Sequence, residues 1–380
     1  MKIEQVRWDE STGWTPHGPG GLNPDPQLVL AFGSPAVLQG SSCIADVVEA
    51  YPHAVLFGCS TAGEICGTRV SDDSLVMTAI WFEHTRVEVA HAEIGGPESS
   101  HAVGLRLATA ISHDGLRHAF ALSDGLGING SDLVRGLKAG LPTHVSVTGG
   151  LSADGPRFAN TFVFCDSAPR RGMAGIIGFY GDKLSIRCAS MGGWDPFGPE
   201  RLITRSEGNV LYQLDGRSAL ALYKEYLGPH AEGLPSTGLL FPLSVRGGQH
   251  ETPVVRTILS VDEARQSMTF AGDVPMGAYA RLMKANVDRL VDGATGAARA
   301  CSGALTDEAA DLAILISCVG RKLVLQQRVE EEVEAVRSVL GEAPVLTGFY
   351  SYGEISPFTP SARCELHNQT MTITLLAEAA

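Results

Sequence analysis

The sequence predicts a mixed α/β fold built from duplicated strand–helix–strand units in two domains. Three observations support this prediction: short apolar runs alternate with helical patterns, a glycine-containing motif occurs three times, and each occurrence follows the same order of elements. With 380 residues, of which 44% are hydrophobic and 19% charged, the chain is long and apolar enough for two domains of ordinary size.

The repeated motif has the pattern Gly-x-x-[Ser/Thr]-x-[Gly/Asp]. Copy 1 (58–65) reads Gly-Cys-Ser-Thr-Ala-Gly-Glu-Ile, and copy 3 (348–355) reads Gly-Phe-Tyr-Ser-Tyr-Gly-Glu-Ile. Copy 2 (149–155) is degenerate and reads Gly-Gly-Leu-Ser-Ala-Asp-Gly. Small residues, a hydroxyl and a carboxylate beside a flexible turn suit a buried polar pocket.

The surroundings repeat with the motif. Each copy follows an apolar run, a helical pattern and a second apolar run, which is a βαβ-like signature. For copy 1 the apolar runs are 28–32 and 55–57, with the helical pattern at 42–50. For copy 2 they are 119–122 and 145–147, with a helical stretch through 133–137. For copy 3 they are 312–316 and 345–346, with a helical pattern over about 322–340.

The other elements are predicted from composition and periodicity. Further strands are expected at 75–80, 87–89, 161–165, 176–179, 184–188, 254–259, 267–270 and 370–376, and further helices at 218–227 and 275–291. Residues 192–198 are predicted as a loop, and 228–253 as a long connection or the cover of a pocket. In the last helix the acidic run 330–332 is expected to face water.

Composition argues against several classes of protein. A net charge of −13 without a basic run disfavours a nucleic-acid-binding protein. No apolar run reaches the roughly 18 residues of a membrane span, and the N-terminus lacks a signal core, so a cytoplasmic protein without membrane contact is expected. Eight cysteines without a CxxC pair suggest reduced thiols and no metal site.

Several of these segments resemble the FIST sensory proteins. Residues 58–65 and 147–150 resemble the N-terminal FIST domain, whereas 348–355 and 366–370 resemble the C-terminal one. The resemblance implies four segments: an N-terminal arm (1–26), a FIST N-type domain (27–218), a FIST C-type ligand-sensing domain (219–363) and a C-terminal strand completing the fold (364–380). It also implies intracellular sensing of small ligands for a partner such as a histidine kinase or cyclase, as in two-component signalling, without an established catalytic reaction.

One branch of similar proteins binds haem and reports nitric oxide to a histidine kinase. The present chain departs from that branch because 193–197 reads Gly-Trp-Asp-Pro-Phe where a histidine-containing stretch is expected. We therefore expect no cofactor, and haem is the alternative, with His367 as its ligand. Trp194 and Phe197 either line an aromatic pocket or pack in the core.

The candidate site residues each have two interpretations. Glu64 and Glu354 either receive an ammonium or hydroxyl group of a ligand or cap their own turns. Arg321, at the end of an apolar strand, either holds a ligand carboxylate or pairs with a helix glutamate. Asn368 either touches the ligand or ties loops together.

The expected ligand is an amino acid or a similar zwitterion, since Arg321 and the two glutamates would complement its charges. The predicted ligand-binding set is Ser60, Thr61, Glu64, Arg321, Ser351, Tyr352, Glu354 and Asn368. A cysteine-dependent enzyme using Cys318 and His367 is a further possibility, although neither Cys318 nor Cys59 lies in a recognised nucleophile motif.

Overall fold

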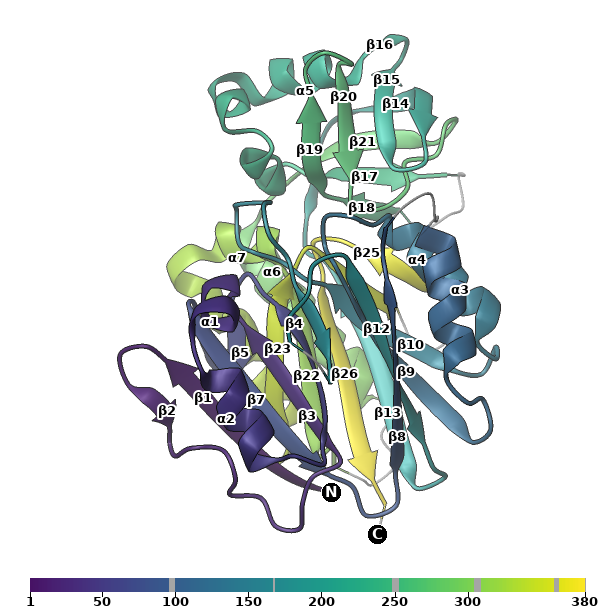
Figure 1. Cartoon of the computed structure of the whole chain (residues 1–380). Helices are drawn as coiled ribbons and strands as arrows, with labels where there is room; N and C mark the ends of the chain where they lie inside the picture. The colour runs from purple at the N-terminus through teal and green to yellow at the C-terminus, as the bar shows by residue number, and fades with distance from the viewer. Residues whose placement is uncertain (96–99, 167, 248–252, 304–308, 359–361, 380) are drawn as a thin grey trace.

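The computed structural model describes residues 1–95, 100–166, 168–247, 253–303, 309–358 and 362–379 (Figure 1). Helices and strands are mixed along the chain, and the strands of the described residues form four sheets. The predicted α/β fold is confirmed.

Three of the four sheets share one strand order, and each belongs to one repeated unit. At the centre of each sheet lies a parallel pair, flanked on one side by an antiparallel strand and then by the first strand of the unit. In unit 1 these strands are β3 (Leu28–Gly33), β4 (Val55–Ser60), β7 (Ser74–Trp81) and β1 (Lys2–Asp9); in unit 2, β9 (Leu116–Ser123), β10 (Ser146–Leu151), β12 (Met173–Tyr180) and β8 (Arg86–Glu93); in unit 3, β22 (Leu312–Cys318), β23 (Val345–Ser351), β26 (Met371–Glu378) and β13 (Leu184–Met191). The fold is therefore a triplication.

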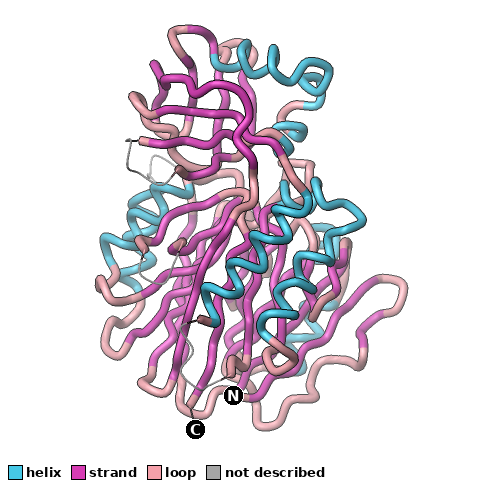
Figure 2. The backbone as a smooth tube through the Cα atoms, turned by 180° about the vertical axis from the view of Figure 1, so that it is seen from behind, coloured by secondary structure: helices cyan, strands magenta, loops and turns pink. Residues whose placement is uncertain are grey.

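Helices cover the outer side of each unit. Figure 1 shows the helices of units 1 and 2 on opposite sides of the molecule, and the view from behind in Figure 2 shows helices crossing the remaining face. They are α1 (Pro35–Gly40) and α2 (Cys43–Ala50) in unit 1, α3 (Ser100–Ala110) and α4 (Gly130–Gly140) in unit 2, and α6 (Val287–Ser302), α7 (Val319–Leu325) and α8 (Val329–Leu340) in unit 3.

The inner faces of the three sheets pack against one another through aromatic side chains. The Phe32 and Phe349 rings, from units 1 and 3, have centroids 4.7 Å apart, and those of Phe57 and Phe120, from units 1 and 2, are 6.4 Å apart. All four side chains are fully buried in one apolar cluster, so the three units share a core.

The short strand after each motif copy leaves its own unit and joins the sheet of another. The strand of unit 1 pairs with unit 3, that of unit 2 with unit 1, and that of unit 3 with unit 2. These strands are β5 (Glu64–Cys66), β11 (Val163–Cys165) and β24 (Gly353–Pro357); the edge strands β2 (Gly13–Thr15), β6 (Arg69–Ser71) and β25 (Cys364–His367) complete the sheets. The exchange is cyclic and interlocks the units.

A fourth sheet is inserted into unit 3 between β13 and α6, and it forms the upper part of Figure 1. This inserted sheet has its own apolar core, covered by α5 (Ala219–Leu227) and the short turns η1 (Gly228–Gly233) and η2 (Ser236–Leu240). Its strands are β14 (Asp195–Glu207), β15 (Val210–Leu214), β16 (Arg217–Ser218), β17 (Leu243–Arg246), β18 (Val254–Arg256), β19 (Ile258–Asp262), β20 (Ser267–Phe270) and β21 (Tyr279–Lys284). The domain boundary expected after residue 218 falls within this sheet.

The helix predicted over 275–291 is wrong. This stretch contains strand β21 and then the start of α6. Along β21, Ala280 and Leu282 are buried while Tyr279 is exposed, so the side chains follow a two-residue period. Asn286 begins the helix by accepting a hydrogen bond from the Arg289 amide at 3.3 Å.

Three smaller expectations also differ from the structure. The predicted arm 1–26 contains β1, which pairs along its whole length with β7; the buried Glu4 on this strand obscures its apolar pattern. The predicted loop 192–198 contains the start of β14. The single helix predicted over 322–340 is divided by η3 (Gln326–Arg328), where Gln326 has a φ of 50°.

The first glycine of each motif copy is required by a close approach of the neighbouring strand. A Cβ atom at Gly149 would lie 1.8 Å from the carbonyl oxygen of Ala121, and one at Gly348 would lie 1.8 Å from that of Leu315. The φ angle of Gly149 is 149°, a backbone conformation that residues with a side chain rarely adopt. The motif therefore begins with glycine because there is no room for a side chain between the parallel strands.

We expect Gly149→Ala to lower the free energy of unfolding by about 3 kcal/mol or more, because the new methyl group must displace backbone rather than a flexible side chain. Urea unfolding monitored by circular dichroism measures this change. Gly40→Ala is the control, since a Cβ there meets nothing within 4 Å, and it should change stability by less than about 1 kcal/mol. Equal midpoints for the two variants would contradict the argument.

Candidate functional site

The three motif copies meet at the centre of the molecule and are joined head to tail by backbone hydrogen bonds. In each copy the fifth residue donates its N–H to the carbonyl of the third residue of another copy. The three bonds are Ala62 to Tyr350 at 2.9 Å, Ala153 to Ser60 at 2.9 Å and Tyr352 to Leu151 at 3.2 Å. We call this closed arrangement the motif ring.

In copy 1 the carboxylate of Glu64 is fully buried and is bound by groups of its own unit. It accepts hydrogen bonds from the hydroxyl of Thr61, from the hydroxyl of Ser74 at 2.5 Å and from the Ser74 amide at 3.3 Å. Burial raises the pKa of Glu64 to about 7, and these hydroxyl donors oppose the rise.

Copy 3 repeats this arrangement. Glu354 is fully buried and accepts from the Ser351 hydroxyl at 2.6 Å and from the Thr370 hydroxyl and amide at 2.9 and 3.1 Å. Burial raises the pKa of Glu354 to about 8. In both copies the carboxylate accepts from a hydroxyl of its own turn, but the backbone amide that it binds belongs to a later segment of the same unit, Ser74 or Thr370. A ligand there would have to displace these internal hydrogen bonds.

Copy 2 differs because its carboxylate, Asp154, comes one position earlier. Asp154 accepts from the backbone amides of residues 158, 159 and 160 at 2.8–3.0 Å, and from the hydroxyl of Tyr352. Tyr352 also stacks on Phe158, with ring centroids 4.7 Å apart. The Ser152 hydroxyl, which corresponds to those of Thr61 and Ser351, has no hydrogen-bond partner among the described residues.

Arg321 is fully buried and forms an ion pair with Glu332 of α8. Its Nε and Nη2 donate to one carboxylate oxygen at 2.9 and 2.7 Å, and the guanidinium also donates to the carbonyls of Gly192 and Leu290 at 3.0 and 2.7 Å. Glu332 accepts in addition from the Tyr350 hydroxyl at 2.6 Å. The expectation that all of 330–332 faces water is wrong, because Glu332 compensates the buried arginine.

The remaining predicted residues also act within the protein. Ser60 donates to the Ala153 carbonyl at 2.9 Å. Asn368 donates to the Tyr352 carbonyl at 2.9 Å and accepts from the Thr257 amide at 3.3 Å, so it ties the inserted sheet to the motif ring. The structure thus brings most of the predicted set together around the ring, with Arg321 attached to it through Glu332 and Tyr350.

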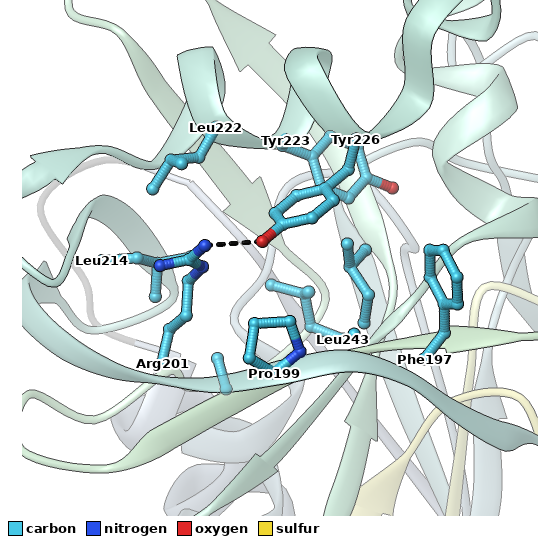
Figure 3. A pocket seen from close by; sticks show the side chains of 11 residues that line it. Phe197, Pro199, Arg201, Leu214, Leu222, Tyr223, Tyr226 and Leu243 are labelled. Carbon is cyan, nitrogen blue, oxygen red and sulfur yellow. Dashed lines mark hydrogen bonds between the residues drawn. The ribbon is translucent and has the colours of Figure 1, made fainter.

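The inserted sheet contains a separate pocket that the sequence did not reveal (Figure 3). It is small, with a cavity volume of about 20 Å³, and it lies between β14, β15, β17, β21 and α5. Most of the lining is apolar: it includes Leu214, Leu222, Leu243, Ala280 and Leu282. Of the two aromatic residues considered in the sequence, Phe197 lines this pocket and is 44% exposed, whereas Trp194 is buried in the core.

The polar side-chain groups at this pocket are the Arg201 guanidinium and the hydroxyls of Tyr226 and Tyr223, and the Tyr223 hydroxyl donates to the Phe241 carbonyl at 2.7 Å. Arg201 Nη2 donates to the Tyr226 hydroxyl at 2.5 Å, drawn as a dashed line in Figure 3, and Nη1 donates to Asp215 at 2.9 Å. The Arg201 Nε lies inside the protein without a partner among the described residues. Neither Arg201 nor Tyr226 stands out in the sequence, because neither lies near a motif copy.

Family models match nearly the whole chain: the FIST N domain matches residues 27–217, and the FIST C domain matches residues 219–357. The chain belongs to the FIST family. FIST domains are sensor domains of signalling proteins, which supports a sensory role.

No curated protein matches the sequence of this FIST protein. Among solved structures, it is similar to cyanuric acid hydrolase from A. caulinodans, with 8% identity, a TM-score of 0.38 and coverage of 100% and 99% of the two chains. A second cyanuric acid hydrolase structure, described as "evolutionary innovation by structural concatenation", has 10% identity, a TM-score of 0.31 and 99% coverage of both chains. Similarity at this level says nothing about the chemistry of the FIST protein.

A haem site would depend on His367, which is buried in this FIST protein. Its Nε2 lies 2.7 Å from the Ser356 carbonyl, and its ring packs against Phe358 with centroids 4.1 Å apart. Burial lowers the pKa of His367 to about 4. The Nδ1 of His367 has no hydrogen-bond partner among the described residues, but the side chain is only 1% exposed, so haem binding would require this part of the core to open.

Two further observations concern a cysteine nucleophile and a metal site. Burial raises the pKa of the Cys318 thiol, which disfavours the thiolate that a nucleophile requires. Within the described ranges, no three His, Cys, Asp or Glu side chains gather as metal ligands would, and no helix has the length and apolar character to cross a bilayer.

We expect Glu332→Gln to lower the free energy of unfolding by about 3–5 kcal/mol, because it leaves the buried charge of Arg321 uncompensated. Chemical unfolding measures the loss. Glu334→Gln, on the exposed side of the same helix, is the matched control and should be nearly neutral. A neutral Glu332→Gln would mean that the ion pair does not stabilise the fold.

The raised pKa of Glu354 predicts a pH dependence. Because the folded-state pKa of about 8 exceeds the ordinary value of 4.5, the folded protein binds this proton more tightly than the unfolded chain does. The associated stability is complete below about pH 4.5 and is lost as the pH rises through 8. Glu354→Gln carries no such proton, so its free energy of unfolding should fall less than that of the wild type between about pH 5.5 and pH 8.5.

Urea unfolding at both pH values measures this difference, and Glu334→Gln should keep the wild-type slope. Parallel pH profiles of Glu354→Gln and the wild type would refute the raised pKa.

Proposed function

We propose that this protein is a small-molecule sensor whose inserted-sheet pocket binds a small carboxylate with an apolar body, such as an apolar amino acid. It would pass the signal to a partner protein such as a histidine kinase or a cyclase. The observation that carries the proposal is the pocket of Figure 3, where an apolar wall meets a single arginine.

The chemistry of Arg201 favours a carboxylate. A guanidinium binds carboxylates in bidentate geometry, and the Tyr226 hydroxyl beside it adds a hydrogen-bonding group. The Arg201 pair with Asp215 is partly exposed, and such pairs contribute little stability, so a ligand can compete for the guanidinium. In an amino acid ligand, Asp215 would face the ammonium group.

The size and the lining of the pocket limit the ligand. The cavity volume of about 20 Å³ is far below the range of small-molecule sites, so only a short ligand body could enter, and the lining side chains would have to move apart to admit it. The leucine side chains favour an aliphatic or aromatic body over a polar one, since burial of apolar surface contributes about 25 cal/mol per Å². A short branched or aromatic carboxylate meets both conditions.

Hydrogen bonds also connect the inserted sheet, which contains the pocket, to residues next to the motif ring. Arg256 of the inserted sheet is buried and donates to the Leu366 carbonyl at 2.9 Å, next to the Asn368 bridge described above. Signalling requires that the ligand favour one conformation, because equal affinity for two states shifts nothing. A shift of the inserted sheet against the three units would supply those two states.

A thermal-shift series tests the ligand class with three probes: leucine, 4-methylpentanoate and the neutral 4-methylpentanamide. We expect the two carboxylates to raise the melting temperature by a few degrees at saturating concentration, and the amide to have little effect. Arg201→Gln should abolish the rise because it removes the cation. Arg217→Gln is the control, since Arg217 pairs with Glu225 at 3.0 Å and does not line the pocket.

Failure of both carboxylates to raise the melting temperature would contradict this ligand class. If the amide raised the melting temperature as much as the carboxylates do, or if Arg201→Gln responded as the wild type does, any binding would occur outside this pocket.

A further inference from the structure

The pocket of the inserted sheet is tied to η2, the short turn that follows α5 and η1. Tyr223 of α5 lines the pocket in Figure 3, and its hydroxyl donates at 2.7 Å to the carbonyl of Phe241, the residue that directly follows η2. The Phe241 side chain packs against the same apolar core as Tyr223. A displacement of Tyr223 therefore acts directly on the end of η2.

The other side of η2 is attached to the three units. The Leu239 side chain is fully buried in an apolar cluster to which all three units contribute, and not in the core of the inserted sheet. Ser236 donates its hydroxyl to the Pro156 carbonyl at 2.8 Å, in the loop that Asp154 of motif copy 2 fixes. The turn η2 thus lies between the pocket and the motif ring and contacts both sides.

Gln369 joins η2 to motif copy 3. Its Nε2 donates to the Leu239 carbonyl of η2 at 2.9 Å and to the Thr257 hydroxyl of the inserted sheet at 3.2 Å. The next residue, Thr370, donates its amide and its hydroxyl to the buried carboxylate of Glu354. A short series of hydrogen bonds and chain neighbours therefore connects the pocket, through η2 and Gln369, to the ring.

The position of Gln369 costs free energy in two ways. Its φ angle is 65°, in the left-handed region that residues other than glycine rarely adopt. Its Oε1 has no hydrogen-bond partner among the described residues, although the side chain is fully buried. A Cβ atom at Gly320 of α7 would lie 2.2 Å from Nε2, so glycine there leaves the space that the carboxamide occupies. Strain of this kind is typical of segments that switch between two arrangements.

We propose that η2 and Gln369 transmit ligand binding from the pocket to the motif ring, an inference that rests on the proposed sensor function. The cavity has about 20 Å³, so a ligand body enters only if the lining side chains, Tyr223 among them, move apart. That movement shifts the Phe241 end of η2 and breaks the hydrogen bond from Gln369 to Leu239. The ligand favours this released state because the closed pocket has no room for it.

Hydrogen–deuterium exchange of the whole chain without ligand tests the coupling. Tyr223→Phe removes the hydroxyl that ties η2 to α5, and we expect amide exchange over 236–241 and over 369–372 to rise at least about threefold. Tyr226→Phe is the matched control. It removes a hydroxyl of the same helix and the same pocket that bonds to Arg201 and not to η2, so exchange in both segments should keep the wild-type rate.

Gln369→Gly breaks the link between η2 and copy 3, and glycine suits the left-handed backbone at this position. In this background Tyr223→Phe should no longer change the exchange beside residue 369, because η2 is already disconnected from it. Gln266→Gly is the control, since Gln266 has a φ of 51° and its side chain bonds only to Ser218 and Glu263 among its printed contacts, both beside the inserted sheet's own strands. Tyr223→Phe should keep its full effect there.

Calorimetric titration with 4-methylpentanoate separates this inference from the proposed function. Coupling between two sites is reciprocal, so a protein in which η2 is already released should bind the ligand more tightly. We expect Gln369→Gly to bind 4-methylpentanoate several-fold more tightly than the wild type does, and Gln266→Gly to bind it as the wild type does. If the wild type does not bind this probe, the proposed ligand class fails, while the exchange experiment still decides whether the coupling exists.

Three results would overturn the proposal. One is equal exchange over 369–372 in Tyr223→Phe and Tyr226→Phe, a comparison that remains decisive even if Gln369→Gly folds poorly. Another is a full effect of Tyr223→Phe in the Gln369→Gly background. The third is an affinity of Gln369→Gly for 4-methylpentanoate that is equal to or weaker than that of a binding wild type.

Discussion

The structure depends on the closure of the motif ring. In each of the three turns the fifth residue donates a backbone hydrogen bond to one neighbour and the third residue accepts one from the other, so the arrangement is complete only when all three copies are in place. The strands that follow the turns extend the same exchange into the sheets. Glycine at the start of each copy, and the buried carboxylates beside the turns, serve this close packing of backbone.

Local sequence patterns predicted much of this frame. The strand–helix–strand order of each unit and the three motif copies were predictable because periodicity and turn residues act over short stretches. The cyclic strand exchange was not predictable, since nothing in the sequence of a strand indicates the unit with which it pairs. Over 275–291 an alternating strand followed by a helix resembled one helical face, and Glu332 resembled its solvent-exposed neighbours because its partner, Arg321, lies on a different helix.

The candidate site was predictable only in part, for a related reason. The chosen residues do gather around the ring, because a repeated turn marks a place where backbone segments converge. Their polar groups, however, are occupied by one another. The proposed ligand-binding group, Arg201, lies outside the repeat, in the inserted sheet. The repeat forms the scaffold, and the proposed pocket lies in the inserted sheet, which units 1 and 2 lack.

The cyclic exchange of strands also has a consequence for biosynthesis. Strand β5 of unit 1 completes its ladder only against β23, and Gln5 of β1 donates to the Leu346 carbonyl, 341 residues further along the chain. A chain made from its N-terminus must therefore wait for unit 3 before unit 1 has its native neighbours. Contacts of such long sequence separation slow folding, and the open sheet edges of the nascent chain are exposed to aggregation in the meantime.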